Sequence, residues 1–266
     1  MSTFFYFAKC GKVTGMEKYT LITGASRGIG RAIALALAKE GRNLIIIADK
    51  DKPGLFETLT QVKHTYIENF GIGPAMYMRC RPFMCDVADE DMVEYLFEQL
   101  KKENCRVDAL INNAGVSCFR LVQDMSPAAW RRVIGVNLDG AFFMSRMVLP
   151  SMIRSKEGAI INISSYWGSA GSAAESAYCA SKGGLNAFTL SMAKELEPSN
   201  IRVNAIACEY INTEMNAAFS KEEAKEAASQ MPSGRIIEPC EIADLVTKLL
   251  APDCEITGRI IGMEDL

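Results

Sequence analysis

Histidine is almost absent from this chain, since His64 is the only one in 266 residues. A single histidine excludes a metal site with several histidine ligands and disfavours catalysis by a serine–histidine pair, so no metal site is expected. Basic blocks are also lacking, and the formal net charge is −3. The sequence therefore predicts binding neither to nucleic acid nor to an anionic membrane surface.

Paired cysteine motifs and long apolar runs are missing as well. The nine cysteines are scattered and form no CxxC pair, which indicates reduced thiols in a cytoplasmic protein. No run approaches the roughly eighteen apolar residues of a membrane-spanning helix. The aromatic cluster at 4–7 is too short for the core of a signal peptide. We therefore expect an N-terminal extension at 1–16 and one folded domain at 17–266.

The sequence does contain apolar strands that alternate with amphipathic helices. This alternation predicts an α/β fold, a single doubly wound Rossmann domain with a parallel sheet. Strands are predicted at 19–22, 43–48, within 71–85 (with extra loop residues at 79–83), 107–111, 159–163, 201–206 and 259–262. Helices are predicted from the glycine turn to about residue 41, at 53–69, 90–102, 127–154, 176–196 and 239–250, with a lid-like segment at 213–230.

A glycine-rich turn, Thr23 to Gly30, follows the first predicted strand and reads TGASRGIG. Strand, glycine turn and helix together are the context of a nucleotide-binding motif. Gly24 permits the tight turn, Gly28 leaves room for a pyrophosphate, and Gly30 allows close packing of helix on strand. The free amides of the helix N-terminus then point at phosphate. The alternative is an ordinary turn that binds no ligand.

A carboxylate, Asp49, ends the second predicted strand about twenty residues after the glycines. In that place it binds the adenosine ribose 2′-hydroxyl and repels a 2′-phosphate. Arg27 and Lys50 lie nearby in the sequence and are able to bind such a phosphate. NAD(H) and NADP(H) therefore both remain possible cofactors, with NAD favoured. Asp86, after the third strand, is expected at the adenine ring.

Tyr178 and Lys182 stand four residues apart in the predicted helix 176–196, so they share one helix face. A nearby ammonium favours the phenolate and lowers a tyrosine pKa that is otherwise near 10. Ser165 follows the strand 159–163 and offers a hydroxyl to the same reacting oxygen. Small neighbours such as Gly183 and Gly184 would let another molecule approach this face. The alternative is a surface tyrosine and lysine.

Two asparagine features lie between these motifs. The sequence NNAG at 112–115 follows the fourth strand, and Asn112 is expected mainly to fix the turn. Asn137 lies inside the predicted helix 127–154. A buried amide there must be hydrogen-bonded, hold a water or distort the helix, because an unpaired amide costs about 1–3 kcal/mol.

In this order and spacing, TGASRGIG, NNAG, Asn137, Ser165 and Tyr178-x-x-x-Lys182 resemble the short-chain dehydrogenase/reductase family, over about residues 18–262. The resemblance implies a seven-stranded Rossmann sheet. It also implies that Tyr178 is the general acid/base, Ser165 orients the reacting oxygen, Lys182 binds the nicotinamide ribose and Asn137 keeps a water in a proton relay. The implied cofactor contacts are Gly24, Ser26, Arg27, Gly28, Ile29, Gly30, Asp49, Asp86, Val87, Asn113, Ala114, Gly115, Tyr178, Lys182, Ile211 and Thr213.

The pattern is most similar to bacterial 3-oxoacyl-carrier-protein reductases. That implies hydride transfer between NAD(P)(H) and the carbonyl or secondary alcohol of a small-molecule or carrier-bound substrate. The alternatives are an elongation factor P aminopentanone reductase-like enzyme, a steroid or polyol dehydrogenase, and a non-catalytic nucleotide-binding protein. The family also implies a homotetramer or homodimer, with contacts expected on the apolar faces of two long helices: Phe142, Phe143, Met147, Leu185, Phe188 and Leu190.

The sequence departs from the family pattern in two places. Cys208-Glu209 replace the usual Pro-Gly after the sixth strand, so Glu209 is expected to be strained and to place its charge near the nicotinamide. The chain ends at 262–266 without the usual glycine pair, which affects the expected subunit interface. Substrate specificity is assigned to segments 117–124, 169–175 and 209–231. Possible contacts there are Glu175 and Glu209 for a cationic group, and Arg120, Arg131 and Arg132 for a phosphopantetheine arm.

Overall fold

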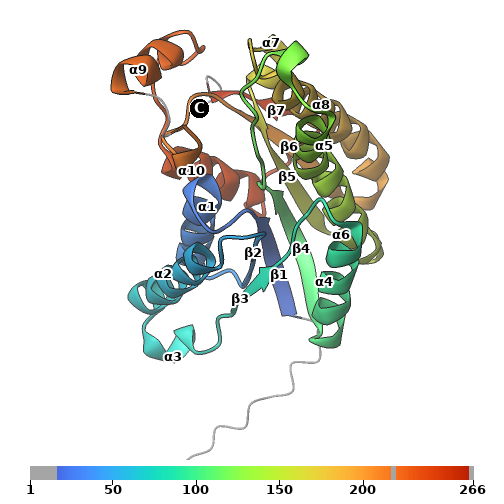
Figure 1. Cartoon of the computed structure of the whole chain (residues 1–266). Helices are drawn as coiled ribbons and strands as arrows, with labels where there is room; N and C mark the ends of the chain where they lie inside the picture. The colour runs from blue at the N-terminus through green and yellow to red at the C-terminus, as the bar shows by residue number, and fades with distance from the viewer. Residues whose placement is uncertain (1–16, 217–219, 264–266) are drawn as a thin grey trace, which may run out of the picture.

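A parallel sheet runs through the middle of the protein (Figure 1). The computed structural model describes residues 17–216 and 220–263, and within them the sheet has seven strands in the order β3-β2-β1-β4-β5-β6-β7. Every neighbouring pair is parallel. The strands are β1 (Glu17–Thr23), β2 (Leu44–Ala48), β3 (Cys80–Met84), β4 (Cys105–Asn112), β5 (Gly158–Ser165), β6 (Ile201–Cys208) and β7 (Ile260–Ile261). The predicted doubly wound Rossmann fold is confirmed.

Helices cover both faces of this sheet (Figure 1). One face carries α1 (Gly28–Lys39), α2 (Lys52–Phe70) and α10 (Pro239–Leu250), and the other carries α4 (Glu90–Lys102), α5 (Pro127–Ile134), α6 (Gly140–Ser155) and α8 (Ser176–Leu196). The short elements are α3 (Ile72–Ala75), α7 (Trp167–Ala170), α9 (Lys221–Ser229), η1 (Val122–Asp124), η2 (Gly135–Asp139), η3 (Glu197–Ser199) and η4 (Glu214–Asn216). No helix among the described residues is both long enough and apolar enough to span a membrane.

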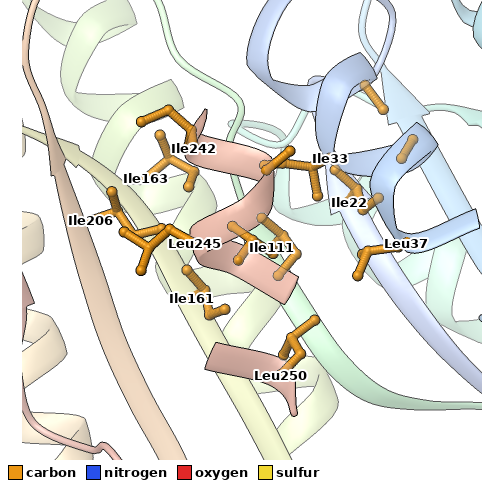
Figure 2. Close-up of a cluster of buried hydrophobic side chains, with 14 of the residues drawn as sticks. Ile22, Ile33, Leu37, Ile111, Ile161, Ile163, Ile206, Ile242, Leu245 and Leu250 are labelled. Atoms are coloured by element: carbon orange, nitrogen blue, oxygen red, sulfur yellow. The ribbon is translucent and has the colours of Figure 1, made fainter. Parts of the chain in front are cut away.

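Two apolar cores follow from the strand alternation. Ile22 of β1 points into the core under α1 and α10, whereas Leu21 points into the core under α4 and α8. Figure 2 shows the first core, in which Leu245 of α10 lies near isoleucines from the central strands. Strands buried on both faces need apolar residues at successive positions, which explains why the predicted strands read as nearly continuous apolar runs.

The third strand corrects one prediction. Residues 79–83 were expected to be extra loop, but they lie almost entirely in β3, which pairs with β2 along its full length. The extra residues instead form α3 and the turn after it. β3 is an edge strand, and an edge tolerates Pro82 and partly exposed residues, so its sequence looks less like a strand than the central ones do.

The predicted long helix at 127–154 is helical but not uniform. It consists of α5, a π-helical turn at η2 and α6. Asn137 lies in the π turn. The helix is therefore distorted at this residue, which is one of the three possibilities that the sequence left open. Such turns place one extra residue in a helix and occur mostly at functional sites.

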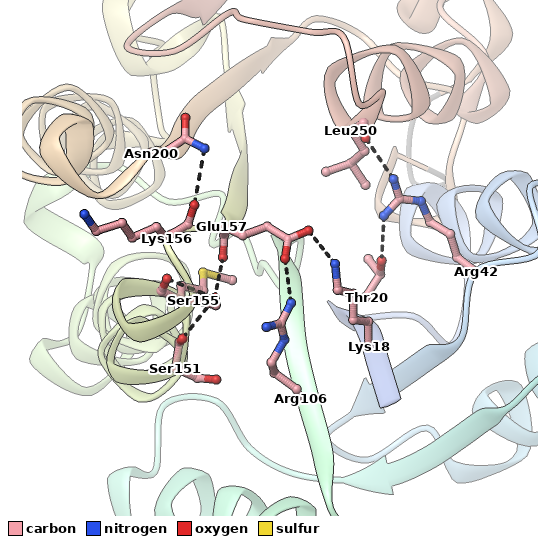
Figure 3. Close-up of polar contacts among 11 residues, drawn as sticks. Lys18, Thr20, Arg42, Arg106, Ser151, Ser155, Lys156, Glu157, Asn200 and Leu250 are labelled. Atoms are coloured by element: carbon pink, nitrogen blue, oxygen red, sulfur yellow. Dashed lines mark hydrogen bonds and ion pairs between the residues drawn. The ribbon is translucent and has the colours of Figure 1, made fainter. Parts of the chain in front are cut away.

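Charged side chains at the amino ends of β1, β4 and β5 form a cluster of ion pairs (Figure 3). Glu157, just before β5, accepts from Lys18 of β1 at 2.5 Å and from Arg106 of β4 at 2.7 Å. These two cations hold the pKa of the Glu157 carboxyl below its usual range. Lys18 and Glu157 are about half exposed, so their ion pair contributes no more than about 1 kcal/mol. This cluster is structural and contains none of the predicted site residues.

Candidate active site

A cleft of about 1410 Å³ opens at the carboxyl ends of the strands. It includes the point between β1 and β4 where the strand order reverses, which is where open α/β sheets bind ligands. The structure brings nearly all the predicted site residues to its wall, from Gly24 at one end of the sequence to Thr213 at the other. The exceptions are Gly30 and Asn137, which lie behind the wall.

The glycine turn between β1 and α1 has the shape that a dinucleotide pyrophosphate needs. Gly24 and Gly28 have positive φ angles of 65° and 54°. A Cβ on Gly30 would lie 2.2 Å from the Gly24 carbonyl oxygen, so only glycine allows α1 to begin this close to the turn. Arg27, the N-cap residue of α1, makes no side-chain cap, which leaves the first helical amides facing the cleft. These residues fit a dinucleotide.

Asn113 fixes this turn from the side. Its Nδ2 donates to the carbonyl oxygens of Thr23 and Gly24 at 2.9 and 3.0 Å, while Thr23 Oγ1 accepts from the backbone of Asn113 and Ala114. The prediction that Asn112 fixes the turn is therefore wrong. Asn112 is buried and donates to Ser145 and Asn162 instead, because its side chain points to the opposite side of β4 from that of Asn113.

At the adenosine end of the cleft, Asp49 and Asp86 face the same cation. Arg132 of α5 donates to Asp49 at 2.9 Å and also to Asp86. The sequence placed Arg132 among possible contacts for a carrier arm, and the structure corrects this by placing it between two predicted cofactor ligands. Arg120 and Arg131 are exposed and do not line the cleft. Sequence reasoning missed Arg132 here because 83 residues separate it from Asp49.

The predicted catalytic side chains meet at the opposite end of the cleft. The hydroxyl of Ser165, at the end of β5, is hydrogen-bonded to the phenol of Tyr178 on α8. Lys182 lies one helical turn further along, with its Nζ 5.7 Å from the centre of the Tyr178 ring. The Lys182 ammonium is buried and donates to the Ile163 carbonyl oxygen at 2.7 Å. Two elements, β5 and α8, thus supply Ser165, Tyr178 and Lys182.

Burial, more than charge, governs the pKa values of this set. Burial raises the pKa of the Tyr178 phenol above its usual value, and the hydrogen bond with Ser165 only partly opposes this. The sequence-based expectation that Lys182 lowers the Tyr178 pKa is therefore wrong for the net shift. Burial also lowers the pKa of Lys182 to about 8 and raises the pKa of the neighbouring Cys208 thiol to about 12. At neutral pH Tyr178 is a protonated phenol, which is the form that gives up a proton.

Buried polar contacts hold α8 on the sheet. Ser164 Oγ donates to Asn186 at 2.6 Å, and Asn162 Nδ2 donates to Thr189 at 2.8 Å. The small residues Gly183 and Gly184 also allow α8 to pack closely against its neighbours. The prediction that they leave room for another molecule is wrong. A Cβ on Gly183 would lie 2.8 Å from the backbone of Gly168 in α7, and one on Gly184 would lie 2.9 Å from Leu138.

Asn137 connects three parts of the site. Its Oδ1 accepts from the Val116 amide at 2.8 Å, and its Nδ2 donates to the Val116 carbonyl and to Ser181 of α8, both at 2.9 Å. The buried amide is therefore hydrogen-bonded through its side chain as well as placed in a distorted helix turn. These contacts tie the loop after β4 to the helix that carries Tyr178. The proposed role of Asn137 in holding a water stays a prediction.

The backbone of Glu209 is not strained as the sequence predicted. Its φ is not positive, so the backbone is not strained there. Its Oε2 accepts from the Ser233 amide at 3.1 Å and from the Ser233 hydroxyl. These hydrogen bonds connect the end of β6 to the chain just after α9. Glutamate is tolerated where the family usually has glycine because φ is not positive at this position. Glu209 is buried and lines the cleft.

The predicted specificity segments come together at the cleft mouth. Ser117 donates to Glu175 at 2.8 Å, and the Arg120 amide donates to the Ala174 carbonyl at 2.7 Å, so the loops at 117–124 and 169–175 support each other. Within the lid-like segment, α9 packs through an apolar cluster onto the active-site side: Tyr210, Ala228 and Met231, with Tyr166, Trp167, Ala224, Ala227 and Ile236 around them.

A doubly wound sheet with a phosphate-binding glycine turn and a Ser–Tyr–Lys set in one cleft defines a nicotinamide-dependent oxidoreductase. The chain matches the short chain dehydrogenase family over residues 18–224, and it belongs to that family. It is therefore an NAD(P)-dependent oxidoreductase that interconverts carbonyl and CH–OH groups.

Relatives with assigned names are similar over nearly the whole chain. The chain is 34% identical to the 3-oxoacyl-(acyl-carrier-protein) reductase FabG of Thermotoga maritima, covering 93% of this chain and 96% of that protein. It is also 34% identical to the uncharacterized oxidoreductase YmfI of Bacillus subtilis, covering 93% and 98%. Among solved structures, a single-residue variant of actinorhodin polyketide ketoreductase with NADPH is similar, with a TM-score of 0.83, 29% identity and coverage of 93% and 95%.

The buried lysine predicts an alkaline limit to the reaction. We expect kcat/KM for ketone reduction to be level between about pH 6 and 7 and to fall above about pH 8, because Lys182 loses its proton there while Tyr178 keeps its own. The limiting slope is about tenfold per pH unit for loss of one essential proton. Initial rates from about pH 6 to 10, with full activity recovered on return to about pH 7, measure it. A level profile across that whole range would show that the Lys182 charge is not needed.

Proposed function

We propose that this enzyme works as a ketoreductase, reducing a ketone to a secondary alcohol with NAD(P)H. The observation that carries the proposal is the position of the Tyr178 phenol, which lines the cleft with its hydrogen-bonding partner Ser165 and whose pKa is raised by burial. When bound, the reduced nicotinamide supplies a hydride to the carbonyl carbon. A phenol that holds its proton at neutral pH suits this direction better than the reverse, in which Tyr178 must accept a proton.

The residues divide the chemistry at the carbonyl oxygen. The C=O bond opens as its carbon gains the hydride, and the oxygen takes the proton of Tyr178. The hydroxyl of Ser165 donates a hydrogen bond to the same oxygen and stabilises its growing negative charge. Lys182, with a fixed ammonium close to the ring, favours the phenolate that remains. Solvent then returns a proton to Tyr178.

Similarity to a 3-oxoacyl-(acyl-carrier-protein) reductase makes a 3-oxoacyl thioester the first substrate to test for this chain. The experiment mixes the purified protein with NADPH or NADH and an acetoacetyl thioester, and follows the loss of the nicotinamide absorbance. Loss of absorbance that depends on both substrate and Tyr178 supports the proposal. The absence of turnover with every ketone in a panel of thioesters, steroids, polyol-derived ketones and amino ketones would contradict it and favour a non-catalytic binding protein.

A second substrate class, ketones with a cationic group, is favoured by the charge of the cleft mouth. Beyond the adenosine end, the glycine turn and Lys182, the charged side chains that line the described cleft are all acidic: Glu175, Glu209, Glu214, Glu223 and Glu226. Such a lining repels the phosphate of a carrier arm and attracts an ammonium. An amino ketone reduced faster than its neutral isostere in the same panel would identify this class.

We further propose that the protein is cytoplasmic, with residues 17–266 as its catalytic domain. The eight cysteines in the described ranges are all free thiols, which is typical of a reducing compartment. The proposed extension at 1–16 lies outside the described residues.

We also propose a homotetramer or homodimer formed through α5, α6 and α8. Trp130, Phe142, Ile153 and Leu190 on these helices are 39% to 45% exposed, an unusual set of large apolar side chains for solvent. Phe142 packs edge-on against Phe188, with ring centroids 6.2 Å apart, which joins α6 to α8 in one apolar surface. Leu185 was expected on this surface, but it is buried within the monomer.

Light scattering tests the assembly. We expect the purified protein to have a multiple of the 29.2 kDa chain mass at micromolar concentration. Replacing Phe142 and Leu190 together by glutamate should lower the mass, because two charges would be buried in the interface. Replacing the exposed Tyr77 of another surface by glutamate is the matched control and should leave the mass unchanged. A wild-type protein of monomer mass would contradict the proposal.

A further inference from the structure

Arg132 occupies a position that the family motifs do not assign. Its guanidinium lies between two carboxylates, with Nη2 2.9 Å from Asp49 Oδ2 and Nη1 hydrogen-bonded to Asp86 Oδ2. Asp49 follows β2 and Asp86 follows β3, and these are neighbouring strands of the sheet. All three side chains line the adenosine end of the cleft. One cation on α5 therefore reaches both acidic groups that the sequence assigns to adenosine.

This arrangement changes what Asp49 does to a 2′-phosphate. A free carboxylate at the end of β2 repels the phosphate of NADP(H) and binds the ribose hydroxyls of NAD(H). Here the Asp49 carboxylate is hydrogen-bonded to the positively charged guanidinium of Arg132, which it shares with Asp86 and which partly offsets its charge. Two of the five N–H groups of that guanidinium serve the carboxylates, and arginine is the side chain best suited to share further N–H groups with a phosphate.

The other nearby cations are weaker candidates for this effect. Lys50 lies 3.9 Å from Asp49, but its side chain is 86% exposed, so water and salt screen it. Arg27 is exposed and makes no ion pair in the described part of the chain. Arg132 is only 39% exposed and its two partners are 32% and 22% exposed. The least screened positive charge beside Asp49 is therefore that of Arg132.

We propose that Arg132 is the residue that sets the cofactor preference, by masking the charge of Asp49 and offering N–H groups to the 2′-phosphate of NADP(H). The inference rests on the dinucleotide occupying this cleft, as the family and the glycine turn imply. The proposal differs from the sequence-based prediction, in which the Asp49 carboxylate favours NAD. The preference is set by a pair of residues, one after β2 and one on α5, and not by the carboxylate itself.

Dissociation constants for NADPH and NADH, measured by fluorescence titration without substrate, test the proposal. We expect Arg132→Ala to weaken NADPH binding at least tenfold while NADH binding stays equal or becomes tighter, so that the ratio of the two constants moves at least tenfold towards NADH. Arg131→Ala removes the same charge one residue earlier on α5, where the side chain is exposed and lies outside the cleft. This matched control should leave the ratio within twofold.

Two further variants keep the test decisive. Arg132→Gln preserves size and hydrogen bonding but removes the charge, and it should shift the ratio like alanine even if Arg132→Ala unfolds. In an Asp49→Asn background, Arg132→Gln should shift the ratio clearly less, because the carboxylate that needs masking is gone. An unchanged ratio in Arg132→Gln, or a shift as large in Arg131→Ala, would overturn the proposal. If the wild-type protein bound neither dinucleotide, the cofactor assignment would fail, and this proposal with it.

Discussion

Replacing Tyr178 by phenylalanine should lower kcat/KM for ketone reduction by about 10²–10⁴-fold, the usual contribution of a positioned general acid. The ring remains and only the proton donor is lost, so NAD(P)H binding should stay within about threefold of wild type. The phenol is the group that both faces the cleft and hydrogen-bonds to Ser165. Initial rates under saturating cofactor, together with a cofactor titration, separate the two effects.

Tyr166→Phe is the matched control for this prediction. Tyr166 follows Ser165 directly, and its ring packs beside Trp167, with 5.3 Å between the ring centroids. It loses the same atom from the same kind of side chain near the same cleft, so its rate should stay within a few-fold of wild type. If Tyr178→Phe retained more than a tenth of the wild-type kcat/KM, Tyr178 would not be the proton donor.

Gly30→Ala should have the largest effect on stability among single methyl additions in the glycine turn. The new Cβ would lie 2.2 Å from the Gly24 carbonyl oxygen and 2.6 Å from Asn113 Nδ2, so both the turn and the Asn113 side chain must move. Overpacking of this kind costs about 1–3 kcal/mol, and here it also distorts the phosphate site. We expect a lower free energy of unfolding in urea and a loss of NAD(P)H binding of tenfold or more.

Gly73→Ala provides the control for the added methyl group. Gly73 lies in α3, has no positive φ, and a Cβ there meets nothing within 4 Å. The same substitution should therefore change the free energy of unfolding by less than about 0.5 kcal/mol. If Gly30→Ala were equally mild and bound cofactor normally, the close packing of α1 on the turn would not be required for the site.

The active-site chemistry was readable from the sequence because its residues stand in local motifs. A turn that requires glycines and a tyrosine and lysine one helical turn apart are short-range patterns, so their spacing along the chain largely fixes their geometry. The central strands were predicted for the same reason, since burial on both faces demands a continuous apolar run. β3 was misplaced because an edge strand is under no such demand.

The other errors concern contacts and burial that depend on distant parts of the chain. Asn113, and not Asn112, donates the hydrogen bonds that hold the glycine turn. Asn112 instead hydrogen-bonds to buried side chains such as Asn162, on a neighbouring strand that the sequence alone does not place beside it. Glu209 was expected to be strained because a glycine usually stands there, but Ser233, 24 residues later, supplies its hydrogen bonds. The pKa of Tyr178 was expected to fall because only its lysine neighbour was visible, whereas burial depends on everything packed around the ring.

By itself, then, the sequence determined the fold and the class of reaction and predicted the residues that carry it, because periodicity and short motifs encode local geometry. Tertiary structure alone decided which charges meet. Arg132 of α5 meets Asp49 and Asp86, which follow β2 and β3, only once the chain is folded, and acidic side chains from separate segments line the cleft mouth. Electrostatic interactions act through space, so cofactor and substrate preference depend on distances that the linear order of residues does not contain.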